Sequence, residues 1–171
     1  MAQSLDTAAA EDQAIALGRR FYSAFAQRDG DTMAACYAPG ARFSDPAFGE
    51  LRDGDPGKMW QMLCKQAQDL QIVLDRIQLL PSGPQTAVVE AQWTATYTFS
   101  LTKRRVVNVV VSRLEVDRSQ GLIVSQDDQF DFWKWSRQAL GVAGVLLGWS
   151  SLLQNQVRKQ ALNGLRKFKK S

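Results

Sequence analysis

The sequence has 171 residues, of which 45% are hydrophobic and 22% are charged, and this length and composition suit one globular domain with a full core. It contains no histidine, which excludes Ser-His-Asp and Cys-His catalysis, histidine-ligated metals and imidazole proton shuttles. The two cysteines, Cys36 and Cys64, form no CxxC motif, so neither a thiolate zinc site nor a disulfide framework is expected. Acid–base chemistry must therefore use carboxylates, phenols, lysines or water, and we expect no metal and no cofactor.

The basic residues are concentrated at the C-terminal end of the chain. The formal net charge is +4, yet residues 157–171 contain six lysines and arginines and no acidic residue, so the rest of the chain has a charge of −2. We expect this segment to be a solvated helix end, whose cations complement the helix dipole. Contact with a membrane surface is the less favoured alternative. Nucleic acid is not an expected partner, because these cations are not interleaved with an aromatic stacking platform.

The apolar segments are too short for a membrane span. The longest, 139–149, has 11 residues, whereas a span needs about 20. The acidic N-terminal segment lacks the basic and apolar regions of a signal peptide. These features predict a cytoplasmic protein with reduced cysteines.

The apolar residues of the N-terminal part recur at helical spacing. Ala14, Leu17, Phe21 and Phe25 lie three or four positions apart and predict a long first helix. Asp31 is the expected N-cap of the second helix. In chain order, the expected elements are helices over 7–28 and 32–37, a short strand over 41–44, a loop over 49–57 and a third helix over 58–69.

From residue 71 the pattern changes to the alternation that is typical of strands. Val89, Ala91 and Trp93 alternate with polar residues, which predicts one buried and one solvent-facing side. The expected strands cover 71–80, 86–101, 105–117 and 122–132. Three helices followed by four long antiparallel strands predict an α+β fold, in which a cone-shaped, curved antiparallel sheet wraps around the N-terminal helices.

Helices are expected again at the C-terminal end, over 133–140 and 145–168. In the longer one, a stripe that includes Leu146, Trp149 and Leu165 predicts packing on the domain or across a dimer. An apolar segment with tryptophan beside lysines and arginines also suits an interfacial membrane anchor, which we rank second.

Two segments carry a family resemblance. The sequence FYSAFAQRDGDTMAACYAPGARFSDPAFG, residues 21–49, and the hairpin over 110–133 resemble the nuclear transport factor 2-like superfamily. This superfamily includes ketosteroid isomerase, SnoaL-like polyketide cyclases and limonene epoxide hydrolase. The resemblance implies a cone-shaped α+β barrel, a deep cavity at its wide end and a homodimer formed through the sheet. It places the domain at 1–135 and leaves 136–171 as a C-terminal extension that packs on the domain or on a partner.

The resemblance also assigns two candidate catalytic residues. Asp45 stands where ketosteroid isomerase has its general base, and Asp128 stands where the epoxide hydrolase has a water-activating carboxylate. Other required residues are missing. Phe21 and Ser112 replace the two oxyanion donors of the isomerase, residues 96–99 replace the Arg and Asp of the hydrolase, and the cyclase histidine is absent. The resemblance therefore implies the cavity rather than one of these reactions.

Strand alternation independently predicts which side chains point into the cavity. The even-numbered positions from Leu122 to Phe132 share one face, and Asp128 is the carboxylate on it. Asp127 and Asp131 fall on the other face, so the DDQFD sequence of 127–131 is not expected to hold a metal. The expected ligand-binding residues are Tyr22, Trp93, Tyr97, Asn108, Val110, Ser112, Leu114, Gln126 and Phe130.

Two carboxylates in an apolar pocket should have raised pKa values, so one could act as a base and the other as an acid. Each also has a structural alternative: Asp45 would cap the turn at Pro46, and Asp128 would bond to Tyr22 or to a backbone amide.

The leading hypothesis is a SnoaL-like protein that binds a small apolar, cyclic or carbonyl-bearing molecule. Asp45 and Asp128 are its candidate catalytic residues, for isomerisation, cyclisation, or hydration or hydrolysis. The alternative is a non-catalytic ligand-binding or dimerisation module whose basic C-terminal helix contacts a partner or a membrane surface. The sequence leaves open whether the protein is an enzyme.

Overall fold

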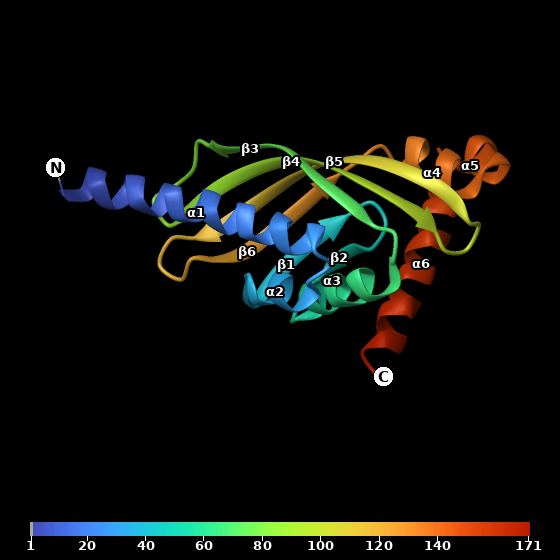
Figure 1. The fold of residues 1–171 in the computed structure, drawn as a ribbon, viewed down its shortest axis with the longest axis horizontal. Coiled ribbons are helices and arrows are strands. Elements are labelled where there is room, and N and C mark those ends of the chain that lie inside the picture. Colours follow the sequence, from blue (N-terminus) through green and yellow to red (C-terminus); the bar gives the residue numbers. More distant parts are fainter. Residues whose placement is uncertain (1) are drawn as a thin grey trace.

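A six-stranded curved sheet forms the frame of the fold, with helices packed on its concave side and at one end (Figure 1). The structure is a computed structural model that describes residues 2–171, with side chains from residue 12 onward. The helices are α1 (Ala2–Ala26), α2 (Gly30–Ala35), α3 (Asp55–Gln66), α4 (Phe132–Leu140), α5 (Val142–Leu147) and α6 (Ser151–Phe168). The strands are β1 (Tyr37–Asp45), β2 (Gly49–Leu51), β3 (Gln71–Leu80), β4 (Thr86–Phe99), β5 (Arg104–Asp117) and β6 (Leu122–Gln129). The expected α+β fold with a curved sheet is confirmed.

The strand order is β2-β1-β6-β5-β4-β3. All neighbours pair antiparallel except β1 and β6, which are parallel, with Phe43 opposite Gln126 and Ser44 opposite Asp127. The sequence predicted neither this parallel pair nor β2, which lies inside the expected loop 49–57. The β1–β6 pair depends on hydrogen bonds between strands that are distant in the chain, and β2 pairs with β1 across a tight turn. The local alternation of apolar and polar residues indicates neither pairing.

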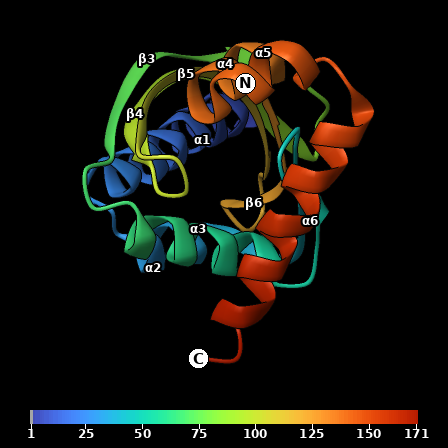
Figure 2. The same ribbon diagram turned by 90° about the vertical axis from the view of Figure 1, so that its right-hand side faces the viewer.

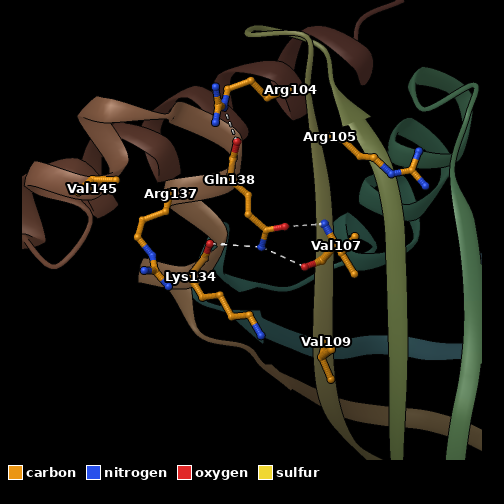
Figure 3. A pocket seen from close by; sticks show the side chains of 8 residues that line it. All are labelled: Arg104, Arg105, Val107, Val109, Lys134, Arg137, Gln138 and Val145. Atoms are coloured by element: carbon orange, nitrogen blue, oxygen red, sulfur yellow. Dashed lines mark hydrogen bonds between the residues drawn. The ribbon is translucent and has the colours of Figure 1, made fainter.

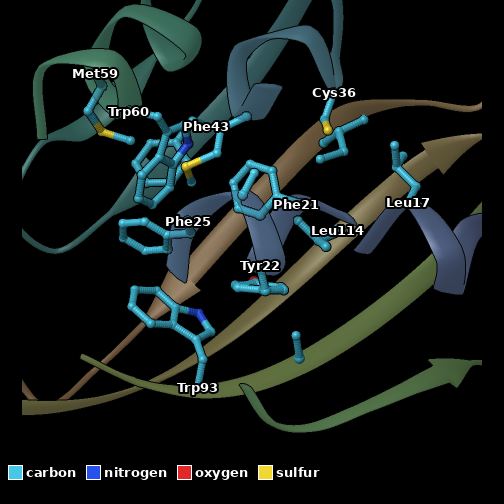
Figure 4. Close-up of a cluster of buried hydrophobic side chains, with 14 of the residues drawn as sticks. Leu17, Phe21, Tyr22, Phe25, Cys36, Phe43, Met59, Trp60, Trp93 and Leu114 are labelled. Atoms are coloured by element: carbon cyan, nitrogen blue, oxygen red, sulfur yellow. The ribbon is translucent and has the colours of Figure 1, made fainter. Parts of the chain in front are cut away.

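Aromatic side chains from α1, α3 and the sheet form the core. The rings of Phe21 and Trp60 lie 5.6 Å apart edge to face, and those of Phe25 and Trp93 lie 5.4 Å apart. Figure 4 shows this cluster, to which both α1 and α3 contribute side chains. Cys36 and Cys64 are buried as free thiols. These ring contacts link α1 to α3 and α1 to β4, so the aromatic core joins both helices to the sheet.

Two helices begin earlier than the sequence predicted. The N-cap of α2 is Asp29 rather than Asp31, since Asp29 Oδ1 accepts a hydrogen bond from Thr32 N at 2.9 Å. Helix α3 begins at Asp55, where Pro56 occupies the first turn and has no amide hydrogen to satisfy. The start of α2 is therefore set by a local cap, two residues before the expected one.

A bulge in β6 breaks the expected alternation. Val116 pairs with Ile123 while Glu115 pairs with Ser125, so Val124 is an extra residue. Ile123 is therefore buried, whereas Leu122 and Val124, which were expected on the inner face, are only partly buried. Beyond the bulge, Gln126 and Asp128 point inward as predicted.

The expected long C-terminal helix is two helices. α5 ends at Gly148, and Ser150 then caps α6 by accepting a hydrogen bond from Leu153 N at 3.3 Å. Leu146 and Trp149, which were expected to pack on the domain or across a dimer, do not pack on the domain, because both are largely exposed. Helix α6 instead packs through Leu165, and its Lys169 forms an ion pair with Asp55 of α3. Within residues 2–171, no helix combines the length and the apolar character that crossing a bilayer requires.

The α2–α3 contact predicts the effect of one substitution. A Cβ at Gly30 would lie 2.6 Å from Gln61 Cα, in the backbone of α3. We expect Gly30→Ala to lower the free energy of unfolding by about 2 kcal/mol through overpacking, as measured by urea denaturation. At Gly83 an added Cβ would meet no atom within 4 Å, so Gly83→Ala should leave stability unchanged or raise it by about 0.5 kcal/mol. Equal stabilities of the two variants would contradict the prediction.

Candidate active site

A cavity of about 420 Å³ lies between the concave side of the sheet, α3 and α6. Figure 2 shows α6 running beside α3, opposite β3 and β4. Its wall is mostly aromatic and aliphatic, with a small number of polar side chains. Among the lining residues are Phe25, Asp45, Phe48, Met59, Trp60, Met62, Trp93, Tyr97, Leu101, Asn108, Val110, Asp128, Phe130, Trp135, Val157 and Ala161. Apolar walls with sparse polar groups, at this volume, are typical of sites for small molecules.

Asp128 is the most enclosed carboxyl group in the cavity wall. It is 3% exposed and lies on β6 directly opposite Ser112 of β5. Its removal from water raises the pKa of the carboxyl group to about 7. Hydrogen bonding from Ser112 and Gln126 opposes this rise, while the charges of Asp45 and Asp127 add to it. At neutral pH a large fraction of Asp128 is therefore protonated.

Asp45 reaches the same cavity from the end of β1. The parallel register pairs Ser44 with Asp127, so the next residues, Asp45 and Asp128, occupy adjacent positions on neighbouring strands. Desolvation raises the pKa of Asp45 to about 6, against hydrogen bonds from the turn amides and the charge of Arg158. One of those amides, Phe48 N, donates to Asp45 Oδ1 at 2.5 Å. Asp45 thus caps its turn, as the structural alternative predicted, and also lines the cavity.

A chain of buried hydrogen bonds holds Asp128 from behind the wall. Trp60 Nε1 donates to Tyr37 Oη at 2.8 Å, and Tyr37 Oη donates to Gln126 Oε1 at 2.5 Å. Gln126 Nε2 then donates to Asp128 Oδ1 at 2.9 Å. Because both ends of the Gln126 amide are engaged, its orientation is fixed, and so is the carboxyl oxygen that it contacts.

A second group of hydrogen-bonding side chains, from β4 and β5, lies beside Asp128. Trp93 Nε1 donates to Ser112 Oγ at 2.8 Å, and Ser112 faces the carboxyl group. The hydroxyl group of Tyr22 is buried near Ser112, Trp93 and Asp128. Burial and the nearby charge of Asp128 raise the pKa of Tyr22 well above its usual value, so this phenol stays neutral.

The predicted ligand-binding residues divide into two layers. Trp93, Tyr97, Asn108, Val110 and Phe130 line the cavity together with the two aspartates. Tyr22, Ser112, Leu114 and Gln126 do not, since they are fully buried behind the wall. Their inward direction was predicted correctly. Whether these four residues influence a ligand from behind the wall stays a prediction.

The sequence did not predict the residues that close the cavity from the helical side. Met59 and Met62 of α3 and Val157 and Ala161 of α6 complete its wall. Arg158, counted there as a solvated cation, instead packs against Gly49, where an added Cβ would lie 2.9 Å from Arg158 Nε. Its charge acts on Asp45, and its Nε has no hydrogen-bond partner within the described part of the chain. The helical periodicity of α6 could have indicated a buried face, but not what that face covers.

The three aspartates of DDQFD have separate surroundings. Asp127 points outward, where it bonds to Ser44 and forms an ion pair with Arg42 at 2.5 Å. Asp131 caps α4 by accepting from Lys134 N at 2.9 Å. Among the side chains that the structure describes, from residue 12 onward, no three of the metal-binding types gather in one place.

The burial of Asp128 predicts how stability depends on pH. Its pKa in the folded state, about 7, lies above the usual value, so the folded state binds this proton more tightly than the unfolded chain does. The free energy of unfolding should therefore fall as the pH rises from about 4 through 7. Asp128→Asn keeps an oxygen that accepts from Gln126 Nε2 but removes the carboxyl group that titrates. The decrease in the free energy of unfolding between about pH 4 and 7 should therefore be smaller in this variant, by an amount on the order of a few kcal/mol.

Urea denaturation at several pH values measures this effect. The control is Asp75→Asn, which changes a carboxyl group on the exposed outer side of β3 and should keep the slope of the wild type. A slope that Asp128→Asn leaves unaltered would show that the carboxyl group is not desolvated as the structure indicates.

Comparison with known proteins agrees with this fold. Curated proteins offer no significant sequence match. Among solved structures, an LEH-like epoxide hydrolase from M. tuberculosis is 22% identical, with a TM-score of 0.54 over 84% of this chain and 96% of that one. A proposed polyketide cyclase from Xanthomonas campestris is 14% identical, with a TM-score of 0.60 over 76% and 98%. A proposed dehydratase of the NTF2-like family from Streptomyces avermitilis is 15% identical, with a TM-score of 0.59 over 70% and 94%.

At these identities the likeness to solved structures shows a shared fold alone. The sequence itself matches the family model described as a SnoaL-like domain over residues 18–126, which is more than half of the chain. That range runs from α1 to Gln126, the residue that holds Asp128. The chain therefore belongs to the SnoaL-like domain family.

Proposed function

We propose that the protein binds a small apolar molecule, cyclic and carrying a carbonyl group, and moves a proton on it with Asp45 and Asp128. The observation that carries this proposal is the pair of carboxyl groups with raised pKa values on one apolar wall, about 6 for Asp45 and about 7 for Asp128. Carboxyl groups are rarely left in such surroundings without a use, because desolvating them is costly.

The two pKa values assign different roles to the two groups. Near pH 6.5, between the values of about 6 and about 7, Asp45 is mainly ionised and Asp128 mainly protonated. Asp45 can then take a proton from a carbon next to the carbonyl group, while Asp128 donates its proton to the carbonyl oxygen, which gives an enol. In a β,γ-unsaturated ketone this enol is conjugated with the C=C bond. Return of the proton from Asp45 to the far carbon of that bond shifts the double bond next to the carbonyl group, and return of the oxygen proton to Asp128 completes the isomerisation.

The rigid support of Asp128 favours this division of roles. Gln126 holds one carboxyl oxygen as a hydrogen-bond acceptor, so the proton of the acid is directed to the other oxygen. Aromatic side chains, among them Trp93 and Trp135, line the cavity and would contact an apolar ring and exclude water from the reacting carbon.

Hydrogen exchange tests the reaction with simple cyclic ketones, including cyclohexenone, as probes. In D₂O we expect the wild type to accelerate exchange of the protons next to the carbonyl group, as followed by NMR. Asp45→Asn keeps an acceptor for Phe48 N but cannot take a proton, so it should lower the rate by 10²-fold or more. The matched control is Asp75→Asn, which changes an exposed carboxyl group on β3 and should retain the rate.

A non-catalytic binding module is the competing function, and the capping of the Phe48 turn by Asp45 favours it. Tryptophan fluorescence distinguishes the two, because Trp60, Trp93 and Trp135 line the cavity. Quenching by the ketones without any exchange would overturn the catalytic proposal and leave the binding function.

The pH dependence of this exchange follows from the same groups. The rate should rise as Asp45 ionises near pH 6 and fall as Asp128 loses its proton near pH 7, which gives a narrow bell. Asp128→Asn does not titrate, so its lower rate should show only the rising limb. A rate that increases steadily up to pH 9 would contradict the role of Asp128 as the acid.

Two further expectations accompany the proposal and stay predictions. The family resemblance implies a homodimer formed through the outer face of the sheet, where Val73 of β3 is exposed. The sequence also predicts a cytoplasmic location, with which two reduced, buried cysteines are consistent.

A further inference from the structure

The end of the molecule formed by α5 and the start of α6 exposes a continuous group of large apolar side chains. Trp149 is 77% exposed, Leu152 81% and Leu146 64%. We call this group the end face; its members are Val142, Val145, Leu146, Leu147, Trp149 and Leu152. Figure 1 places α5 at the end of the fold opposite the N-terminus. Apolar residues gathered in this way mark an interaction surface rather than ordinary surface composition.

The packing of α5 fixes the outward direction of these side chains. An added Cβ at Gly144 would lie 1.9 Å from Ser136 O, and one at Gly148 would lie 2.1 Å from Ser136 Oγ. The two glycines, four residues apart, therefore form the side of α5 that touches α4. Since the inner side is glycine, the large side chains must point outward. The indole of Trp149 is held there by a hydrogen bond from Nε1 to Leu146 O at 3.0 Å.

A basic groove borders the end face between α4 and β5 (Figure 3). Its volume is about 750 Å³, and its lining residues are Arg104, Arg105, Val107, Val109, Lys134, Arg137, Gln138 and Val145. Val145 belongs to both surfaces. The groove is a built feature, because the Gln138 side chain bridges the helix and the strand: its Oε1 accepts from Val107 N at 2.9 Å, and its Nε2 donates to Val107 O at 3.0 Å.

Contacts with neighbouring groups hold two of the arginine side chains of the groove in place. Arg104 Nε donates to Gln138 O at 2.7 Å, and the guanidinium group of Arg137 lies 4.2 Å over the ring of Trp133. No acidic side chain lines the groove, and the sequence from residue 132 to 171 contains no Asp or Glu. The groove therefore suits an anion, and its valines suit an anion that is attached to apolar chains.

We propose that the end face docks on membranes that contain anionic phospholipids. The apolar side chains of α5 and Trp149 enter the boundary between headgroups and acyl chains, and the groove takes lipid phosphate groups through Arg104, Lys134 and Arg137. A second copy of the chain fits this surface poorly, because it would bring the same cations against one another.

Sedimentation with vesicles tests the docking on the full-length protein. We expect binding to phosphatidylcholine vesicles that contain about 30% phosphatidylserine, weak binding to pure phosphatidylcholine, and loss of binding at high salt. Leu146→Ser with Trp149→Ser removes apolar contact, and Lys134→Gln with Arg137→Gln removes charge. Each pair should weaken binding on the order of tenfold. These side chains lie on the surface, so thermal midpoints should stay close to that of the wild type.

The matched control is Arg19→Gln with Lys58→Gln, which removes two exposed cations from α1 and α3. It should bind vesicles as the wild type does, because these positions lie away from the end face. A loss equal to that of Lys134→Gln with Arg137→Gln would show that net charge alone drives binding and would overturn the proposal.

Depth-dependent quenching provides an independent measurement. Brominated phospholipids should quench the tryptophan emission of the wild type, and Trp149→Phe should remove most of that quenching. Equal binding to anionic and neutral vesicles, or no binding, would overturn the proposal. So would light scattering in which Leu146→Ser with Trp149→Ser converts an oligomer to a monomer while vesicle binding stays unchanged, since the end face would then be an interface between proteins.

Discussion

The parallel pairing of β1 with β6 is the constraint on which the rest of the site depends. It joins strands about 80 residues apart in the chain, and its register sets Ser44 against Asp127. On the outer face, Asp127 bonds to Ser44 and to Arg42 and secures that register. On the inner face, the same register makes Asp45 and Asp128 neighbours. A shift of one residue would turn one carboxyl group out of the cavity.

The three aspartates of β6 and the residues after it have different roles because their surroundings differ. Asp127, Asp128 and Asp131 lie within five positions, yet the first forms an ion pair at the surface, the second is enclosed by aromatic residues and the third caps a helix. Burial raises the pKa of the enclosed carboxyl group, Asp128, to about 7. Desolvation is opposed by two hydrogen bonds and still prevails, because no cation accompanies the group into the wall.

The C-terminal extension connects the two surfaces for which we propose functions. Helix α6 closes the cavity and brings the charge of Arg158 toward Asp45. The segment before it carries the end face. Leu101, in the turn between β4 and β5, lines the cavity and is itself 68% exposed, and its neighbour Thr102 donates to Ala139 O at 2.5 Å at the end of α4. The β4–β5 turn, which lines the cavity through Leu101, is thus in direct contact with the end of α4, next to the end face.

The amino-acid sequence by itself determined the α+β class, three of the four long strands nearly to the residue, and the inward direction of Trp93, Ser112, Gln126 and Asp128. These follow from periodicity, which is a local property of the chain. The sequence could not separate residues that line the cavity from residues buried behind its wall. The alternation of apolar and polar residues indicates which face of the sheet a side chain is on, but not how deeply it is packed. The parallel pair, the bulge at Val124, the division of α5 from α6 and the outward turn of Trp149 were decided by tertiary structure. Each depends on contact between distant segments, and hydrogen bonds or close packing across such a contact outweigh the local preference.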